Sequence, residues 1–229
     1  MNGIVDRLET VRARISVAAR ASGRDPAEVG LVAVSKTQEA LLVREAFDAG
    51  QAVFGESRAQ ELVAKAPLLP SLALWHFIGH LQSNKIRKIL PVVDLIHAVD
   101  SVDLALDIDR IAAQLGLFPR VLLEVNTSGE QTKFGFKPDA LRGQIERLLA
   151  LPRIQVEGLM TIAPLVEHAE DARPFFAALR LLRDELFAET GTPLPVLSMG
   201  MSDDFETAIQ EGATLVRVGT AIFGPRRKL

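Results

Sequence analysis

The chain has 229 residues, of which 48% are hydrophobic, and its formal net charge is -3. This composition excludes a disordered chain, and the weak negative charge provides no general attraction for nucleic acid. The absence of cysteine excludes disulfides, thiolate metal sites and a cysteine nucleophile, and it suits a reducing cytoplasm. No stretch has the length of a membrane span or the pattern of a secretory leader, so we expect a cytoplasmic protein that does not enter a membrane.

The sequence starts with an amphipathic helix and then alternates strands with helices. Apolar residues at helical spacing predict a helix over 2–22, which ends at Gly23. Short aliphatic and β-branched runs predict eight strands, over 30–35, 52–54, 74–78, 94–98, 120–126, 154–160, 195–199 and 214–218. The helices expected between them are 38–49, 57–65, 82–90, 102–115, 138–150, 168–189 and 203–211.

Several predicted helices carry residues typical of helix ends. We expect Thr37 and Ser101 to be N-caps and Pro138 to lie in a first helical turn. Glycines follow four of the helices, at Gly50, Gly116, Gly191 and Gly212.

Eight strands that alternate with helices indicate parallel strands joined by crossover helices. We therefore predict one α/β domain over residues 1–229, a closed (β/α)8 TIM-like barrel with an additional N-terminal helix. An open doubly wound sheet is the alternative. It would leave two edge strands to protect, and the chain has no glycine-rich dinucleotide turn.

The carboxyl ends of all strands in such a barrel open on one face, and that face carries the chemistry. Lys36 comes directly after the first strand, where an ammonium group is costly unless it has a role. A lysine of lowered pKa can form a Schiff base with a carbonyl compound. Taken alone, however, a lysine at a strand end more often reaches into solvent.

The segments after the seventh and eighth strands are typical of a phosphate site. Ser198-Met-Gly-Met-Ser202 brings Ser198, Gly200, Met201 and Ser202 in front of a helix whose first N–H groups face an incoming anion. Arg217-Val-Gly-Thr220 adds a cation, Gly219 and a hydroxyl from the next strand. Ser202 by itself could be only an N-cap, but the two segments together favour phosphate. A lysine and a phosphate site across one barrel mouth indicate either pyridoxal 5′-phosphate or a sugar phosphate.

Three histidines and a basic cluster have simpler interpretations. His76 and His80 are four residues apart on a strand, a spacing that does not bring two metal ligands together, so we expect no metal site. We expect His97 to be partly buried with a satisfied hydrogen bond. The basic cluster Asn84–Lys88 is expected to be a solvated helix face, and a surface that meets a partner protein is the alternative.

Seven segments resemble, in chain order, the motifs of the pyridoxal phosphate homeostasis protein family: Val32–Thr37, Phe54–Glu56, His76–Lys85, Val125–Asn126 with Lys133–Gly135, Gly158–Thr161, Met199–Ser202 and Arg217–Gly224. The resemblance covers residue 30 to the carboxyl terminus. It implies a barrel like the N-terminal domain of alanine racemase, with pyridoxal phosphate as the cofactor and Lys36 as the residue that holds it.

Carried over by position, the resemblance also implies roles for the other residues of the site. Ser202, Gly219 and Thr220 would hold the phosphate, with help from the backbone of Gly200 and Met201. Arg217 would face the pyridine nitrogen, and Ser198 and Asn126 complete the expected cofactor site. Most relatives have Asn-Tyr after the Gly-Glu pair, where this chain has Ser57-Arg58. The ring contact of that asparagine is therefore left open.

The residues favour a carrier over an enzyme. Because arginine keeps its proton, a pyridine nitrogen that accepts from Arg217 stays unprotonated, and the ring is then a weak electron sink. The resemblance to alanine racemase implies that a racemase of this fold needs a tyrosine as a second acid/base, and this chain has no tyrosine. We expect a monomeric protein of intracellular vitamin B6 homeostasis, with apoenzymes as candidate recipients of the cofactor. The alternatives are a weak amino-acid racemase and a Schiff-base sugar-phosphate aldolase.

Overall fold

Eight parallel strands form a closed barrel in the computed structural model, which describes residues 3–225. They are β1 (Gly30–Val34), β2 (Val53–Glu56), β3 (Leu74–Phe77), β4 (Leu95–Val99), β5 (Arg120–Glu124), β6 (Gln155–Met160), β7 (Val196–Ser198) and β8 (Leu215–Val218). Each strand pairs in parallel with the next, and β8 pairs with β1 from Gly30–Leu215 to Ala33–Val218. Closure removes both sheet edges, so the barrel prediction is confirmed and the open-sheet alternative is wrong.

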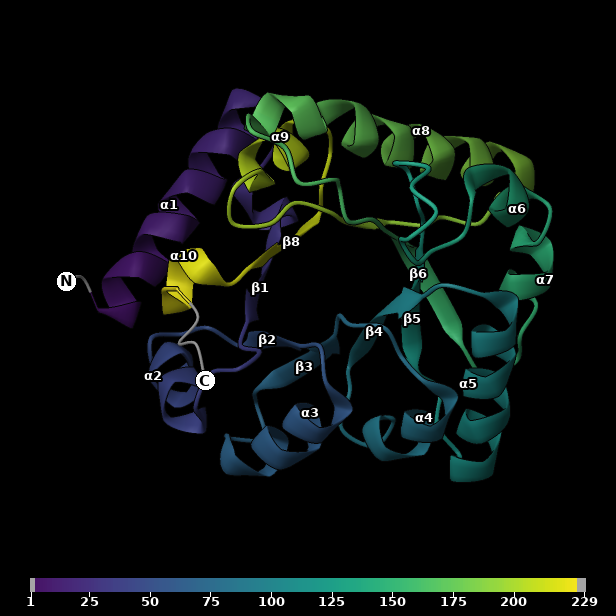
Figure 1. Cartoon of the computed structure of the whole chain (residues 1–229), viewed down its shortest axis with the longest axis horizontal. Coiled ribbons are helices and arrows are strands. Elements are labelled where there is room, and N and C mark those ends of the chain that lie inside the picture. Colours follow the sequence, from purple (N-terminus) through teal and green to yellow (C-terminus); the bar gives the residue numbers. More distant parts are fainter. Residues whose placement is uncertain (1–2, 226–229) are drawn as a thin grey trace.

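Helices surround the barrel on its outside (Figure 1). They are α1 (Ile4–Ala21), α2 (Ala40–Asp48), α3 (Ala59–Lys65), α4 (Ser83–Ile89), α5 (Val102–Leu115), α6 (Pro138–Arg142), α7 (Ile145–Leu149), α8 (Arg173–Thr190), α9 (Phe205–Gln210) and α10 (Thr220–Phe223). Short 3-10 helices add η1 (Pro26–Glu28), η2 (Ala66–Leu68) and η3 (Ala169–Ala172). No helix within residues 3–225 is long and apolar enough to cross a membrane.

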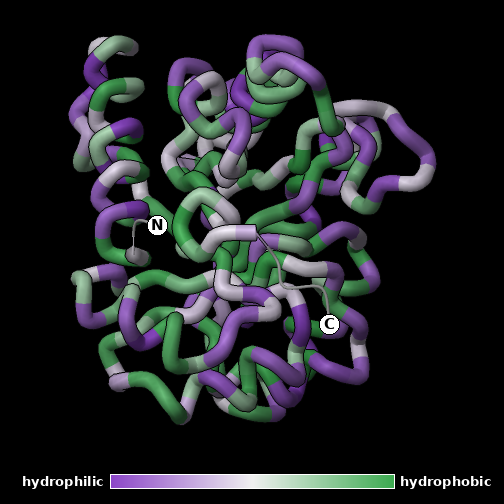
Figure 2. The backbone as a smooth tube through the Cα atoms, turned by 60° about the vertical axis from the view of Figure 1, so that its left-hand side comes forward, coloured by the Kyte–Doolittle hydropathy of each residue, from purple (hydrophilic) through white to green (hydrophobic). Residues whose placement is uncertain are grey.

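The N-terminal helix α1 lies outside the β/α repeat and covers the seam where the barrel closes. Hydrophobic and hydrophilic residues alternate along it in short groups (Figure 2). Its buried face includes Ile4, Leu8, Val11 and Ile15, at the spacing of one helix face. This face packs against α9 and α10, which confirms the amphipathic helix expected from the sequence. Residue 2 of that predicted helix lies outside the described residues.

The predicted strands are all present, with ends shifted by at most two residues. Ser101 is an N-cap whose Oγ accepts from Leu104 N at 3.3 Å, and Pro138 is the first residue of α6, as expected. The predicted helix over 138–150 is instead two helices, because Gly143 ends α6. The prediction for Thr37 is wrong. The N-cap of α2 is Glu39, and Thr37 lies in the preceding turn with a φ of 64°.

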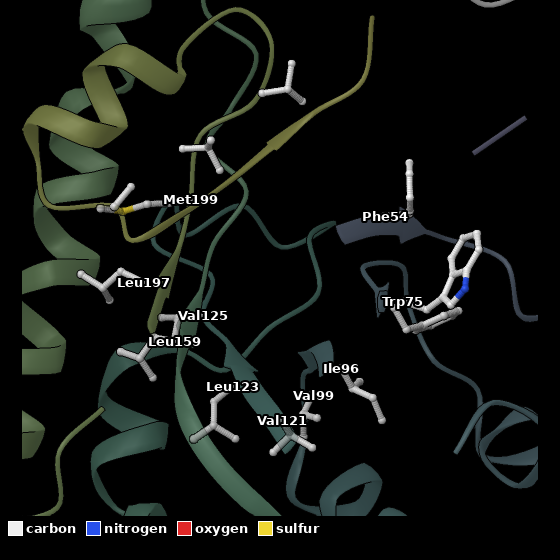
Figure 3. Close-up of a cluster of buried hydrophobic side chains, with 14 of the residues drawn as sticks. Phe54, Trp75, Ile96, Val99, Val121, Leu123, Val125, Leu159, Leu197 and Met199 are labelled. Atoms are coloured by element: carbon white, nitrogen blue, oxygen red, sulfur yellow. The ribbon is translucent and has the colours of Figure 1, made fainter. Parts of the chain in front are cut away.

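Side chains on alternate sides of each strand enter two different cores. The outward side chains, including Phe54, Trp75 and Leu123, pack beneath the helices (Figure 3). A smaller cluster of buried residues consists of Val32, Leu95, Ala98, Leu122, Met160 and Leu215. Two positions after Leu95, Leu122 and Leu215 come His97, Glu124 and Arg217. The barrel interior therefore changes from apolar to polar and ionisable toward the carboxyl ends of the strands.

Candidate functional site

Lys36 is half-buried in the turn that follows β1. Thr37, the next residue, has a φ of 64° and is the one non-glycine residue of the described chain with a positive φ. A β-branched residue rarely adopts this conformation, which costs about 1–3 kcal/mol unless its surroundings impose it. The turn that carries Lys36 is closed by a bond from Gln38 N to Ser35 O at 3.0 Å, and contacts from outside the turn add to this bond.

Three charged residues from β2 and α3 supply these contacts, and we call Glu56, Lys65 and Glu61 the charged cluster. Oε1 of Glu56 accepts from Ser35 Oγ and from Lys65 Nζ, both at 2.7 Å. Lys65 Nζ also donates to Ser35 O at 2.8 Å and to Glu61 Oε2 at 3.1 Å. Glu61 Oε2 in turn accepts from Thr37 N at 2.7 Å. The cluster thus binds the backbone on both sides of Lys36.

The two carboxylates of the charged cluster have opposite electrostatic situations. Burial raises the pKa of Glu56, and the bonds from Lys65 and Ser35 only partly oppose this. Its second oxygen, Oε2, has no hydrogen-bond partner among the described residues. Burial also acts on Glu61, but the Thr37 amide and Lys65 stabilise its charge and lower its pKa. Glu61 therefore loses its proton at a lower pH than Glu56 does.

Across the barrel interior, Arg217 at the end of β8 is buried and fixed by two neighbours. Its Nη1 donates to Ser198 Oγ at 2.6 Å, and its Nη2 donates to Thr161 O at 2.8 Å. Burial lowers the pKa of Arg217 to about 10, against the attraction of Glu124 and Asp204. The guanidinium stays charged at neutral pH. Within residues 3–225 these bonds use two of the five N–H groups of Arg217 and leave three for other partners.

Two neutral histidines continue this line of hydrogen bonds through the barrel. His97 Nδ1 lies 3.0 Å from Ser198 Oγ, and its Nε2 lies 3.0 Å from His76 Nδ1. Burial lowers the pKa of His76 to about 4 and that of His97 well below 6.5. The expected hydrogen bond of His97 is confirmed, although the side chain is entirely rather than partly buried. His80 instead contacts Asp100 at 2.9 Å, so it does not join His76.

Ser202 and Gly219 meet where the loops after β7 and β8 come together. Ser202 Oγ accepts from the backbone N–H of Gly219 at 3.2 Å and of Ala221 at 3.4 Å. A Cβ on Gly219 would lie 3.3 Å from Cβ and O of Val34, so this corner is packed against the end of β1. The structure therefore brings a cluster of main-chain donors and a hydroxyl beside the strand that leads to Lys36.

Three other residues expected to hold a phosphate, Thr220, Gly200 and Met201, lie in the same two loops. Thr220, the first residue of α10, is exposed. Gly200 has a φ of 89°, and its carbonyl accepts from Arg217 N at 3.0 Å. The N–H of Met201 donates to Asp204 Oδ1 at 2.6 Å, so in this structure it is bonded within its own loop.

Comparisons with known proteins agree with this barrel and its sequence motifs. A profile described as alanine racemase, N-terminal domain, matches residues 7–227. The pyridoxal phosphate homeostasis protein of Aquifex aeolicus is 47% identical over 223 residues, which cover 97% of this chain and 98% of that protein. The chain belongs to the pyridoxal phosphate homeostasis protein family.

Solved structures give the same result for the fold. PipY of Synechococcus elongatus PCC7942, solved with PLP bound, matches with a TM-score of 0.85 and 41% identity over 96% of this chain and 100% of that chain. Alanine racemase of Clostridium difficile 630 has a TM-score of 0.76 at 17% identity, and the match covers 97% of this chain and 58% of the racemase chain. The pyridoxal phosphate homeostasis family thus shares its barrel with the racemase.

Asn126, expected in the cofactor site of a pyridoxal phosphate homeostasis protein, has its side chain bonded within its own loop. Its Nδ2 donates to Glu130 O at 2.8 Å, and its Oδ1 accepts from Gly129 N at 2.9 Å and Ser128 Oγ at 3.1 Å. These bonds shape the loop after β5. A contact between Asn126 and a cofactor stays a prediction.

Sequence reasoning missed Glu124 and, of the charged cluster, noted only Glu56, as part of the motif Phe54–Glu56. Burial, together with the charge of Asp100, raises the pKa of Glu124 to about 7, although Arg217 opposes the shift. A signal for this residue existed, since Glu124 follows the apolar run Val121–Leu123 at the end of its strand. Glu61 and Lys65 are four residues apart in a predicted helix, a spacing that places two side chains next to each other on one helix face. No pattern in the sequence, however, connects that pair to Ser35 and Thr37.

Proposed function

We propose that this chain binds pyridoxal 5′-phosphate through a Schiff base on Lys36 and serves in vitamin B6 homeostasis. The observation that carries the proposal is the packing of Gly219 against Val34, which brings Ser202 and its main-chain neighbours next to β1, the strand that leads to Lys36. The bound cofactor of PipY from Synechococcus elongatus supports the same ligand.

The residues present fit the groups of this cofactor. Ser202, Gly219 and Thr220 would hold the phosphate through hydroxyl and main-chain donors, and the remaining N–H groups of Arg217 would donate to the pyridine nitrogen. The cofactor supplies an aldehyde. The Lys36 ammonium gives a proton to solvent, its nitrogen forms a C=N bond with the aldehyde carbon, and the aldehyde oxygen leaves as water.

The arrangement favours holding the cofactor over turning over a substrate. Arg217 remains a cation at neutral pH, so the ring nitrogen that it faces would stay unprotonated. The chain has no tyrosine to act as a second acid/base. His76 and His97 are bonded to each other in the barrel interior and hold a neutral form.

One observation supports a second candidate, a weak amino-acid racemase. Glu124 is buried among the polar groups of the barrel, and its pKa of about 7 suits proton transfer. This candidate predicts that the loaded protein exchanges the α-proton of an amino acid with deuterated water, and that Glu124→Gln abolishes the exchange. An unchanged amino acid would leave the carrier as the function.

Spectroscopy and mass analysis test the carrier proposal. The wild-type chain with pyridoxal phosphate should show an absorbance band that borohydride removes, with the added mass on the Lys36 peptide. Lys36→Ala should abolish the adduct, and the exposed Lys88→Ala should not. Ser202→Ala should lower cofactor affinity about fivefold, since one hydrogen bond is lost. A wild-type protein that takes up no pyridoxal phosphate would contradict the proposal.

We further propose that residues 1–229 act as one monomeric domain in the cytoplasm and pass the cofactor to apoenzymes. The continuous barrel and the absence of cysteine support this. Charge reversal at Lys85 and Lys88 distinguishes a partner surface from a solvated helix face. A partner surface requires slower transfer to an apoenzyme with cofactor uptake unchanged.

A further inference from the structure

We propose that the charged cluster positions Lys36 for reaction with an aldehyde by fixing the backbone on both sides of it. Glu56, Lys65 and Glu61 are positioning residues in this role, because their contacts reach Ser35 and Thr37. The inference rests on the proposed function of Lys36.

Ser35, the residue before Lys36, is held by several hydrogen bonds to other elements. Ser35 donates its Oγ to Glu56 Oε1 at 2.7 Å, and its carbonyl accepts from Lys65 Nζ at 2.8 Å. Its own N–H donates to Gly55 O at 3.0 Å, as a continuation of the β1–β2 pairing. Ser35 is fully buried, so these bonds are shielded from water. The point where the chain leaves the barrel toward Lys36 is therefore set by side chains of two other elements.

The residue after Lys36 is held by Glu61. Thr37 N–H donates to Glu61 Oε2 at 2.7 Å, while its φ of 64° is one that a threonine rarely adopts. The bond from Gln38 N to Ser35 O at 3.0 Å also closes this turn, so loss of the Glu61 acceptor would leave the turn with one bond fewer and the Lys36 side chain less firmly directed. Glu61 is thus the residue through which the cluster fixes the orientation of Lys36.

Lys65 is suited to this role by its complete set of partners. An ammonium has three donors, and those of Lys65 go to Ser35 O, Glu56 Oε1 and Glu61 Oε2. Its side chain is 10% exposed and that of Glu56 is 0% exposed. A buried ion pair seldom repays its own desolvation, but it can specify one arrangement of the chain. Lys65 is therefore a structural ammonium, and we expect no cofactor on it.

The test compares Glu61→Ala with Glu61→Gln and Arg58→Ala. Glu61→Ala removes the acceptor of the Thr37 amide, so the borohydride-trapped adduct on Lys36 should form about tenfold more slowly. Hydrogen exchange at the Thr37 amide should quicken in the same variant without cofactor. Glu61→Gln keeps a carbonyl acceptor and should recover most of the rate. Arg58, whose side chain is 70% exposed and lies 3.7 Å from Glu61 Oε1, is the matched control. Arg58→Ala should behave as wild type.

The outcomes separate this inference from the function on which it rests. A wild-type adduct on Lys36, slowed in Glu61→Ala and rescued in Glu61→Gln, supports it. An adduct that forms equally fast in wild type and Glu61→Ala overturns the inference and leaves the proposed function intact. A Glu61→Gln variant as slow as Glu61→Ala also overturns it. A wild-type chain with no adduct on Lys36 overturns the proposed function and this inference together.

Discussion

The two sides of the barrel mouth are held by different kinds of contact. Around Lys36, the turn is held by the charged side chains of Glu56, Lys65 and Glu61. Around Ser202, the loops meet through main-chain N–H groups, a hydroxyl and close-packed glycine. Main-chain donors suit an anion site because they are neutral and fixed in direction. A turn that presents an amine requires acceptors for its own backbone, and carboxylates supply them.

Removal of the cluster's ammonium should have the largest effect. Lys65→Met leaves Glu56 buried without its cation, so the free energy of unfolding should fall by about 3–5 kcal/mol in urea titrations at pH 7. Lys88→Met, at an exposed lysine of α4, should change it by less than about 0.5 kcal/mol. Equal effects of the two substitutions would show that the charged cluster does not stabilise the part of the barrel mouth around Lys36.

On the Ser202 side of the barrel mouth, a single methyl group added at Gly200 should disturb the close packing of the loop after β7. Gly200→Ala adds a Cβ that would lie 2.6 Å from Ala208 Cβ and 2.9 Å from Phe205 Cα, at a φ of 89°. We expect a loss of about 3 kcal/mol of stability. Gly23→Ala has a φ of 69° but nothing within 4 Å, so its loss should be about 1 kcal/mol. Thermal unfolding of both variants measures how much of the effect comes from close packing.

Between the two sides, Glu124 should make stability depend on pH. Its pKa is raised from 4.5 to about 7, so between these values the folded chain holds a proton that the unfolded chain has released. Its contribution to stability is therefore present at low pH and is lost as the pH rises through 7.

Glu124→Gln removes this dependence. We expect it to stabilise the protein by about 2 kcal/mol at pH 8, where the buried carboxylate is ionised in the wild type, a gain already reduced by the lost attraction to Arg217. At pH 4.5, where the wild-type carboxyl is protonated, it should change the stability by almost nothing. Urea unfolding at both values measures this, with the exposed Glu167→Gln as control. A difference from wild type that is the same at both values would exclude a raised pKa at Glu124.

Much of the architecture could be read from the sequence, and the reason is periodicity. The apolar runs from β1 to β8 are short, β-branched and separated by helical patterns, so their number and order were predictable. The boundaries that differed depend on local competition. Threonine is a residue type typical of an N-cap, yet Thr37 lies in the turn before α2, where its N–H donates to Glu61 from another element. Gly143 divides one predicted helix into α6 and α7.

The candidate site, like the fold, divides into features that the sequence predicts and features that depend on contacts between distant elements. The sequence by itself determined the barrel, Lys36 at the end of β1 and the glycine and serine segments after β7 and β8, because strand ends of a barrel share one face. Only the tertiary structure decided which side chains fix them. The bonds from Thr37 N to Glu61, from Arg217 to Ser198 and between His97 and His76 join residues from different elements. Their strength depends on burial and direction, and neither is encoded in any local pattern.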